Sequence, residues 1–135
     1  MKSSLQIGIG ASTKITVDRE RTIDFMGEQA RVYATPMLVR DIEMACRKLL
    51  LEHLDPGEDS VGTRIELDHL AATLMGMQVQ LDLRVAEIRG RLVSFEVSAS
   101  DSVEPICRCR HQRFVVDLKT TEARLAAKAQ KAGLA

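Results

Sequence analysis

The fold of this chain is decided by residues 35–69, which read TPMLVRDIEMACRKLLLEHLDPGEDSVGTRIELDH. Apolar residues recur at helical spacing through the first half, where Thr35 suits the N-cap and Pro36 the first helical position. The Asp-Pro-Gly sequence at 55–57 predicts the end of this helix. Beyond it the apolar residues alternate with a period of two, which predicts a strand that ends at His69.

Four more strands are predicted, one before the helix and three after the strand that ends at His69. They lie within residues 7–17, 78–85, 93–99 and 104–118, where apolar and polar residues mostly alternate. Because the turns between successive strands are short, we expect neighbouring strands to pair in the antiparallel sense.

The last of these strands does not alternate cleanly. Cys107 and Cys109 stand at odd positions, whereas Phe114 and Val116 stand at even ones. One bulge or a strong twist near residues 111–113 would bring all four side chains to the same face of the sheet.

A long helix with an apolar stripe needs a sheet to cover it. We therefore expect an α+β structure, the hotdog fold, in which a curved antiparallel sheet of about five strands wraps around one long helix. The Ala-rich stretch 120–133 predicts an exposed C-terminal helix, capped by Thr120 or Thr121 and ended by Gly133. Residues 1–135 are expected to form a single domain. A sheet that covers the helix on one side only predicts a homodimer that extends the sheet.

Composition narrows the classes of partner. Lys and Arg together number 19, as do Asp and Glu, so no dominant basic face for nucleic acid is expected. No apolar run reaches the length of a membrane span. The three cysteines, Cys46, Cys107 and Cys109, cannot all pair within one chain, which is typical of a reducing cytoplasm. Cys-x-Cys without a second pair is a weak metal signal, and we expect no metal.

His69 is the first candidate for chemistry. It continues the parity of Ile65 and Leu67, so its side chain is expected to point toward the helix. A histidine there is either a satisfied core residue or a base whose pKa is suited to proton transfer near neutrality.

Glu43 is the second candidate, and its position allows two interpretations. Arg40 and Arg47 stand three and four residues away, a spacing typical of an ordinary surface ion pair on a helix. Val39 and Cys46 flank it on the apolar side, so the carboxylate is also placed to be partly desolvated and reactive.

Backbone groups add to these candidates. The start of the helix at Thr35 offers free N–H groups and a positive dipole end, which can polarise a carbonyl. Gly62 allows a backbone N–H to approach a ligand closely. His53 and His111 are interpreted as structural or surface groups. Neither a phosphate-binding loop nor a Ser-His-Asp hydrolase motif is present.

Three segments resemble a known family: VYATPMLVRDIEMAC, LDPGEDSVGTRIELDHLAATLMG and HQRFVVDL. They are similar to the hotdog-fold acyl-CoA thioesterases, and among these to the fluoroacetyl-CoA thioesterases. The resemblance implies that Thr35, Glu43 and His69 form the catalytic set. It also implies that Gly62 presents its N–H near the thioester and that Arg113 is the family's last-strand arginine, a substrate-binding position.

The resemblance is incomplete where the acyl group is selected. The fluoroacetyl-CoA thioesterases have an aromatic lid of Phe residues before the catalytic Thr, and the matching positions here are Met26 and Gln29. The implied function is hydrolysis of a short-chain acyl-CoA by a cytoplasmic homodimer or tetramer without a cofactor. Two alternatives stay open: a non-catalytic acyl-CoA-binding module, and an enoyl-thioester hydratase or dehydratase.

Overall fold

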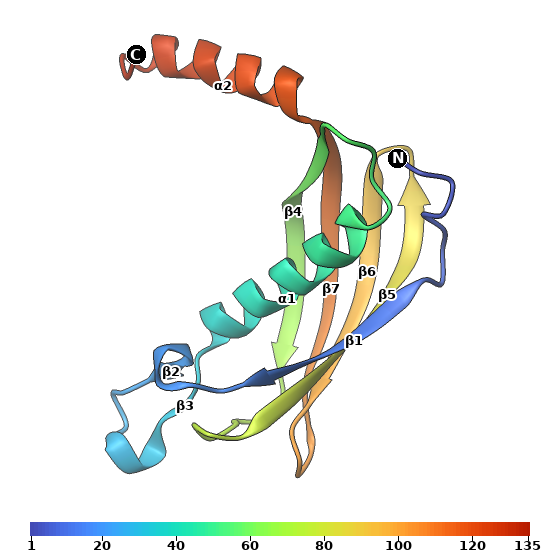
Figure 1. Ribbon diagram of the computed structural model, residues 1–135. Coiled ribbons are helices and arrows are strands. Elements are labelled where there is room, and N and C mark those ends of the chain that lie inside the picture. Colours follow the sequence, from blue (N-terminus) through green and yellow to red (C-terminus); the bar gives the residue numbers. More distant parts are fainter.

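A computed structural model describes all 135 residues. Its main elements are a long helix α1, a C-terminal helix α2 and seven strands (Figure 1). Their bounds are β1 Gly10–Thr16, β2 Thr22–Ile23, β3 Val32–Tyr33, α1 Thr35–Leu51, β4 Glu58–His69, β5 Gln78–Arg89, β6 Leu92–Ser100, β7 Pro105–Asp117 and α2 Leu118–Lys131. The two short helices η1, Arg19–Arg21, and η2, Glu28–Ala30, flank β2 and precede β3.

Five strands form one antiparallel sheet in the order β1-β5-β6-β7-β4. The sheet curves around α1, which lies across its inner face (Figure 1). The helix contributes Leu38, Ile42 and Cys46 to the core, and the strands contribute alternating residues such as Leu81 and Phe95. The predicted α+β hotdog architecture is confirmed, and β4 lies at one edge of the sheet.

The segment before α1 forms a small two-stranded sheet, β2 with β3, beside the start of the helix (Figure 1). A buried polar network holds it there. Arg21 donates to both carboxylate oxygens of Asp41 at 2.9 and 3.1 Å, and the Tyr33 hydroxyl donates to the same carboxylate. The charge of Asp41, which is only 7% exposed, is therefore neutralised within the chain.

Strand β7 corrects the prediction of a bulge or strong twist within the last strand. Its pairing with β6 is regular from Ala99↔Cys107 to Leu92↔Phe114, and its odd-numbered residues face α1 throughout. His111 and Arg113 are therefore buried, while Phe114 is 40% exposed on the outer face. The prediction failed because it assumed that the inner face of this strand is wholly apolar.

A bulge does occur opposite this part of β7, on the neighbouring strand β4. The register of β4 against β7 shifts between Gly62 and Arg64, which leaves Thr63 as the extra residue. Side chains of a regular strand alternate between faces, so an extra residue reverses the parity beyond it. Ser60 and Gly62 before the bulge and His69 after it therefore all face α1, although their numbers differ in parity.

Both predicted helix caps are also corrected. The N-cap of α1 is Ala34, which makes no side-chain hydrogen bond, and Thr35 is the first residue of the helix itself. The N-cap of α2 is Asp117, whose carboxylate accepts from the backbone N–H of Thr120 at 2.9 Å. Helix α2 has no buried residue and projects from the end of β7 (Figure 1), as the sequence predicts for an exposed helix.

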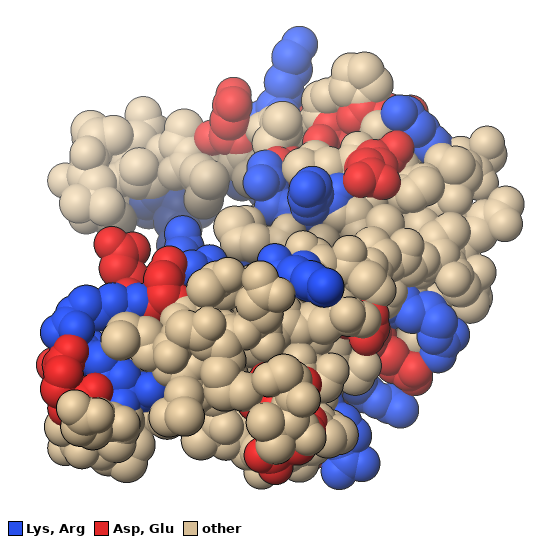
Figure 2. Space-filling model, turned by 60° about the horizontal axis from the view of Figure 1, so that its bottom comes forward, with Lys and Arg blue, Asp and Glu red and all other residues tan.

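The surface carries charges of both signs. On the face seen in Figure 2, Lys and Arg side chains stand beside Asp and Glu side chains, separated by broad uncharged areas. Neither helix is both long enough and apolar enough to cross a membrane.

Candidate active site

The first part of the candidate site is a pair formed by Thr35 and His69, here called the helix-start pair. The Thr35 hydroxyl lies 2.7 Å from Nδ1 of His69, so the first turn of α1 meets the last residue of β4. Nε2 of His69 is buried and has no hydrogen-bond partner in the chain. Burial lowers the pKa of His69 from its ordinary value, which favours the neutral ring.

Glu43 and Gly62 begin a second part of the site, midway along α1. A methyl group at Gly62 would lie 2.9 Å from Oε1 of Glu43, so the carboxylate occupies the space that a side chain on β4 would fill. Arg47, one turn further along α1, forms a two-pronged ion pair with Asp59 instead, at 3.0 and 2.7 Å. No cation of the chain lies within ion-pair distance of Glu43, so the ordinary surface ion pair considered from its spacing to Arg40 and Arg47 is absent.

Arg113 lies beside Glu43 and is only 4% exposed. Its Nε donates to the Ser60 hydroxyl and one Nη to the Ser60 carbonyl, both at 2.8 Å, while the other Nη donates to Nε2 of His111 at 3.2 Å. No carboxylate approaches Arg113 within ion-pair distance. Burial lowers the pKa of Arg113, and the negative charge of Glu43 opposes that shift.

His111 is the residue of the site that the sequence interpretation missed. It is 1% exposed, and its Nδ1 lies 2.8 Å from the backbone carbonyl of Arg64, just after the bulge in β4. Its Cε1 would lie 3.2 Å from a methyl group at Gly62, so His111 also borders the space beside Glu43. The signal was its parity, because His111 and Arg113 share the odd positions of the buried Cys107 and Cys109.

Glu43, Gly62, His111 and Arg113 together are called the mid-helix cluster. Glu43 follows Thr35 by eight residues, so the cluster and the helix-start pair are separated by about 12 Å along α1. The structure therefore brings Thr35 to His69 and Glu43 to Gly62 and Arg113. It does not bring Glu43 to His69 within one chain.

Met26 and Gln29 lie outside both groups. They belong to the connection between β2 and β3, which turns at Gly27 with φ of 93°. Met26 is 53% exposed, Gln29 is also exposed, and Phe25 beside them is 79% exposed. The chain thus places an aromatic residue next to a predicted lid position, but it faces solvent.

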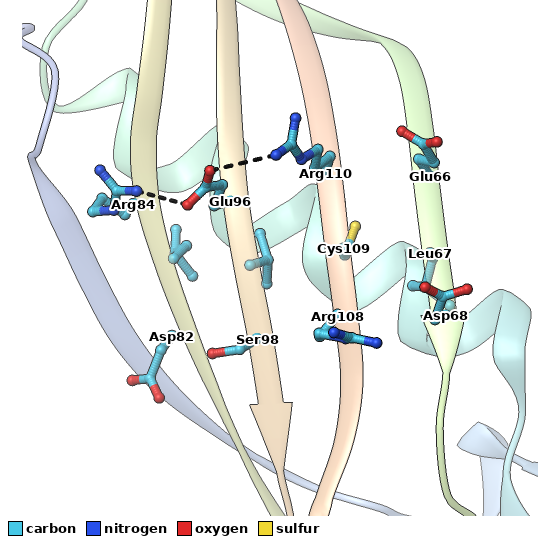
Figure 3. A pocket seen from close by; sticks show the side chains of 12 residues that line it. Glu66, Leu67, Asp68, Asp82, Arg84, Glu96, Ser98, Arg108, Cys109 and Arg110 are labelled. Carbon is cyan, nitrogen blue, oxygen red and sulfur yellow. Dashed lines mark hydrogen bonds and ion pairs between the residues drawn. The ribbon is translucent and has the colours of Figure 1, made fainter.

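A surface groove of about 960 Å³ lies elsewhere on the molecule. Figure 3 shows its charged side chains projecting from the face of the sheet that is turned away from α1. Opposite charges alternate across its strands: Arg84 lies 2.6 Å from Glu96, and Arg110 lies 3.9 Å from the same carboxylate. None of the predicted site residues lines this groove, so its size alone does not make it the candidate site.

No group of three or more His, Cys, Asp and Glu side chains is arranged to hold a metal ion. The chemically distinctive groups are instead a half-buried histidine whose buried Nε2 has no partner, an unpaired carboxylate and a buried cation. This set provides a base, a nucleophile or water activator, and a fixed positive charge.

Comparison with known proteins identifies the family of the chain. The family model described as "Fluoroacetyl-CoA-specific thioesterase" matches residues 17–119. The chain belongs to this family. A curated relative, the fluoroacetyl-CoA thioesterase of Streptantibioticus cattleyicolor, is 31% identical over 132 residues, which cover 93% of this chain and 95% of the relative.

Solved structures support the family assignment. A solved structure of the fluoroacetyl-CoA thioesterase superposes with a TM-score of 0.84 at 30% identity, covering 93% of this chain and 98% of the other. A thioesterase superfamily member from Thermus thermophilus superposes with a TM-score of 0.88 at 27% identity, covering 98% and 99%. Membership of the fluoroacetyl-CoA-specific thioesterase family confirms the resemblance seen in the sequence.

Proposed function

We propose that the protein hydrolyses the thioester bond of a short-chain acyl-CoA, releasing a free acid and coenzyme A. The relative named above is a fluoroacetyl-CoA thioesterase. The observation that carries the proposal is the helix-start pair, in which buried Nε2 of His69 has no partner while Nδ1 is held by Thr35. An unpartnered buried ring nitrogen is costly to the fold, which favours a functional reason for it.

The complete site is proposed to need two copies of the chain. His69 contacts Thr35, which lies about 12 Å from Glu43 along α1, so we infer that Glu43 and His69 of one chain do not act on the same thioester. Strand β4 is an edge strand and can pair with β4 of a second chain. In such a homodimer, His69 of one protomer would meet Glu43 of the partner subunit.

Each group then has a distinct role. Glu43 attacks the thioester carbonyl or activates a water molecule that does so, and His69 serves as the base that orients that water or assists breakdown of the intermediate. The backbone N–H of Gly62 and the first N–H groups of α1 stabilise the oxyanion, at about 3 kcal/mol per donor. The thiolate of coenzyme A leaves with the bonding electrons and is protonated, while the acyl group gains the water oxygen.

Several further features belong to the same proposal. Residues 1–135 act as one domain, and the protein works in the cytoplasm, consistent with its three unpaired cysteines. No cofactor or metal takes part, because N–H groups polarise the carbonyl. Met26 and Gln29 stand at the positions of the aromatic lid, so the acyl pocket is proposed to accept short acyl groups other than fluoroacetyl.

Release of free thiol from a panel of acyl-CoAs tests the function. We expect turnover of at least one short acyl-CoA by the parent protein. Binding without thiol release would indicate the acyl-CoA-binding module instead. Conversion of an enoyl-CoA with coenzyme A still attached would indicate the hydratase or dehydratase.

Subunit complementation tests the two-chain site. Glu43→Ala and His69→Ala variants are prepared separately, each expected to be inactive, and are then mixed under conditions that allow subunits to exchange. A heterodimer would hold one site with both native residues, so about a quarter of the parental activity should return. If both residues of a site come from one chain, mixing restores nothing.

A further inference from the structure

The guanidinium of Arg113 is held in one orientation by three acceptor atoms on two neighbouring strands, β4 and β7. Ser60 on β4 accepts two of its hydrogen bonds and His111 on β7 accepts a third. Three of the five buried polar residues of the chain are these same residues, Ser60, His111 and Arg113. The guanidinium has five N–H bonds, so two are left without a partner in the chain. A buried cation that is fixed in place but not neutralised by the chain is suited to bind a negative charge or a dipole of a ligand.

The geometry also decides the protonation state of His111. A guanidinium can only donate, so Nε2 of His111 must accept and carries no proton. The carbonyl of Arg64 can only accept, so Nδ1 must donate and carries the proton. Only the neutral Nδ1–H tautomer satisfies both neighbours. Both ring nitrogens are occupied, so His111 has none left to act as a base on a substrate.

We propose that His111 is a positioning residue for the thioesterase reaction, which in its neutral Nδ1–H form holds the Arg113 guanidinium beside Glu43 and Gly62. The bulge at Thr63 contributes to this arrangement, because the Arg64 carbonyl that directly follows it lies 2.8 Å from Nδ1 of His111. His111 thereby connects the bulge in β4 to the position of the Arg113 guanidinium at the reacting centre. This inference rests on the proposed function.

Two substitutions separate the contacts of His111. In His111→Gln, the side-chain oxygen reaches the place of Nε2 and still accepts from Arg113. In His111→Asn, the shorter amide retains a donor for the Arg64 carbonyl but leaves Arg113 without this acceptor. We expect His111→Asn to lower kcat about tenfold with KM little changed, and His111→Gln to remain within about threefold of the parent.

A double-mutant cycle distinguishes positioning from a merely structural role. If His111 acts through Arg113, then His111→Asn costs nothing further once Arg113→Met has removed the guanidinium. Equal losses from His111→Asn in both backgrounds would overturn the inference, as would equal activity of His111→Asn and the parent.

The nitrogen resonances of His111 give a readout that does not depend on activity. In ¹⁵N-labelled parent protein at pH 7, Nδ1 should give a protonated signal and Nε2 an unprotonated one. The opposite tautomer, or a doubly protonated ring, would contradict the proposed contacts. A parent that releases no thiol from any acyl-CoA would overturn the proposed function, whereas an active parent with an indifferent His111→Asn variant would overturn only this inference.

Discussion

Strand β7 presents arginines to both faces of the sheet, and the arginines of the two faces differ in burial and in ion-pair partners. Arg110 on the outer face belongs to a row of alternating charges, in which Glu96 lies between it and Arg84 (Figure 3). Arg113, three residues along on the inner face, has no carboxylate within ion-pair distance and is 4% exposed. The outer row is solvated, so its ion pairs contribute little to stability.

This comparison shows that the presence or absence of an ion-pair partner indicates the role of a charged residue better than the residue type does. The inner face also has a neutralised example, because Asp41 is buried but paired with Arg21 and hydrogen-bonded by Tyr33. Glu43 and Arg113 lie near each other without forming such a pair. Two buried or half-buried opposite charges that form no ion pair indicate a site for chemistry, since charges with a purely structural role would be expected to form a direct ion pair.

The largest effect is expected for Glu43→Gln, which keeps the shape of the side chain and removes its charge. We expect kcat for acyl-CoA hydrolysis to fall by about 10²–10⁴-fold, because an amide is neither a nucleophile nor a base here. Glu96→Gln on the outer face is the matched control and should retain full turnover. A Glu43→Gln variant with parental kcat on every substrate of the parent would refute the proposed role.

Arg113→Met should come next. Loss of the fixed charge beside Glu43 should lower kcat by about 10²-fold, as is typical when a preorganised donor is removed. The free energy of unfolding should change by less than about 2 kcal/mol, since the loss of three hydrogen bonds is offset by removal of a buried charge. Arg110→Met, on the outer face of the same strand, should change both quantities very little. Equal effects of the two substitutions would contradict the proposed difference between the inner and outer faces of the sheet.

Gly62→Ala should have an intermediate effect. The added methyl group would lie 2.9 Å from Oε1 of Glu43, and the end of this flexible side chain must move away. We expect kcat to fall by about tenfold while the melting temperature stays near that of the parent, because no backbone atom is displaced. Thr63→Ala, at the exposed bulge residue, is the control. A large loss of stability in Gly62→Ala would show that the close approach serves packing instead.

The effect of pH on stability should be smaller than the effects of the substitutions above, and it should come from histidines on the same inner face. Burial lowers the pKa of both His69 and His111 below the ordinary value, so the unfolded chain binds protons more readily than the folded one. The free energy of unfolding should therefore decline as pH falls below about 6.5, where unfolded histidine becomes protonated. The charges nearest His111 are Arg113, which lowers its pKa further, and Glu43, which raises it. His111→Gln should flatten the decline measured by chemical denaturation, and an unchanged slope would contradict it.

The smallest effect is expected on the outer face. Glu96→Gln breaks the ion pairs of Glu96 with Arg84 and Arg110, yet all three side chains are substantially exposed. The free energy of unfolding should change by less than about 0.5 kcal/mol, and less still at high salt. A loss above about 2 kcal/mol would mean that the outer row is a structural network after all.

The sequence by itself determined the long helix, the five strands, their antiparallel sense and the direction of His69, because hydrophobic periodicity and turn residues are local signals. The strand order, with β4 paired to β7 and not to β5, came only from the tertiary structure. It also placed Thr35 at the start of the helix, although the structure assigns the cap to Ala34 and directs the Thr35 hydroxyl to His69. The parity of β7 was misinterpreted, because periodicity cannot distinguish a polar site on the inner face from a bulge.

Only the tertiary structure decided which polar residues meet. The bulge at Thr63 brings Gly62 and His69 to one face of β4, and the pairing of β4 with β7 places His111 and Arg113 beside Glu43. These contacts join residues up to about 70 positions apart, so no local pattern carries them. The proposed roles of Glu43 and Arg113 depend on which groups lie next to their charges. Those neighbours are determined by long-range packing.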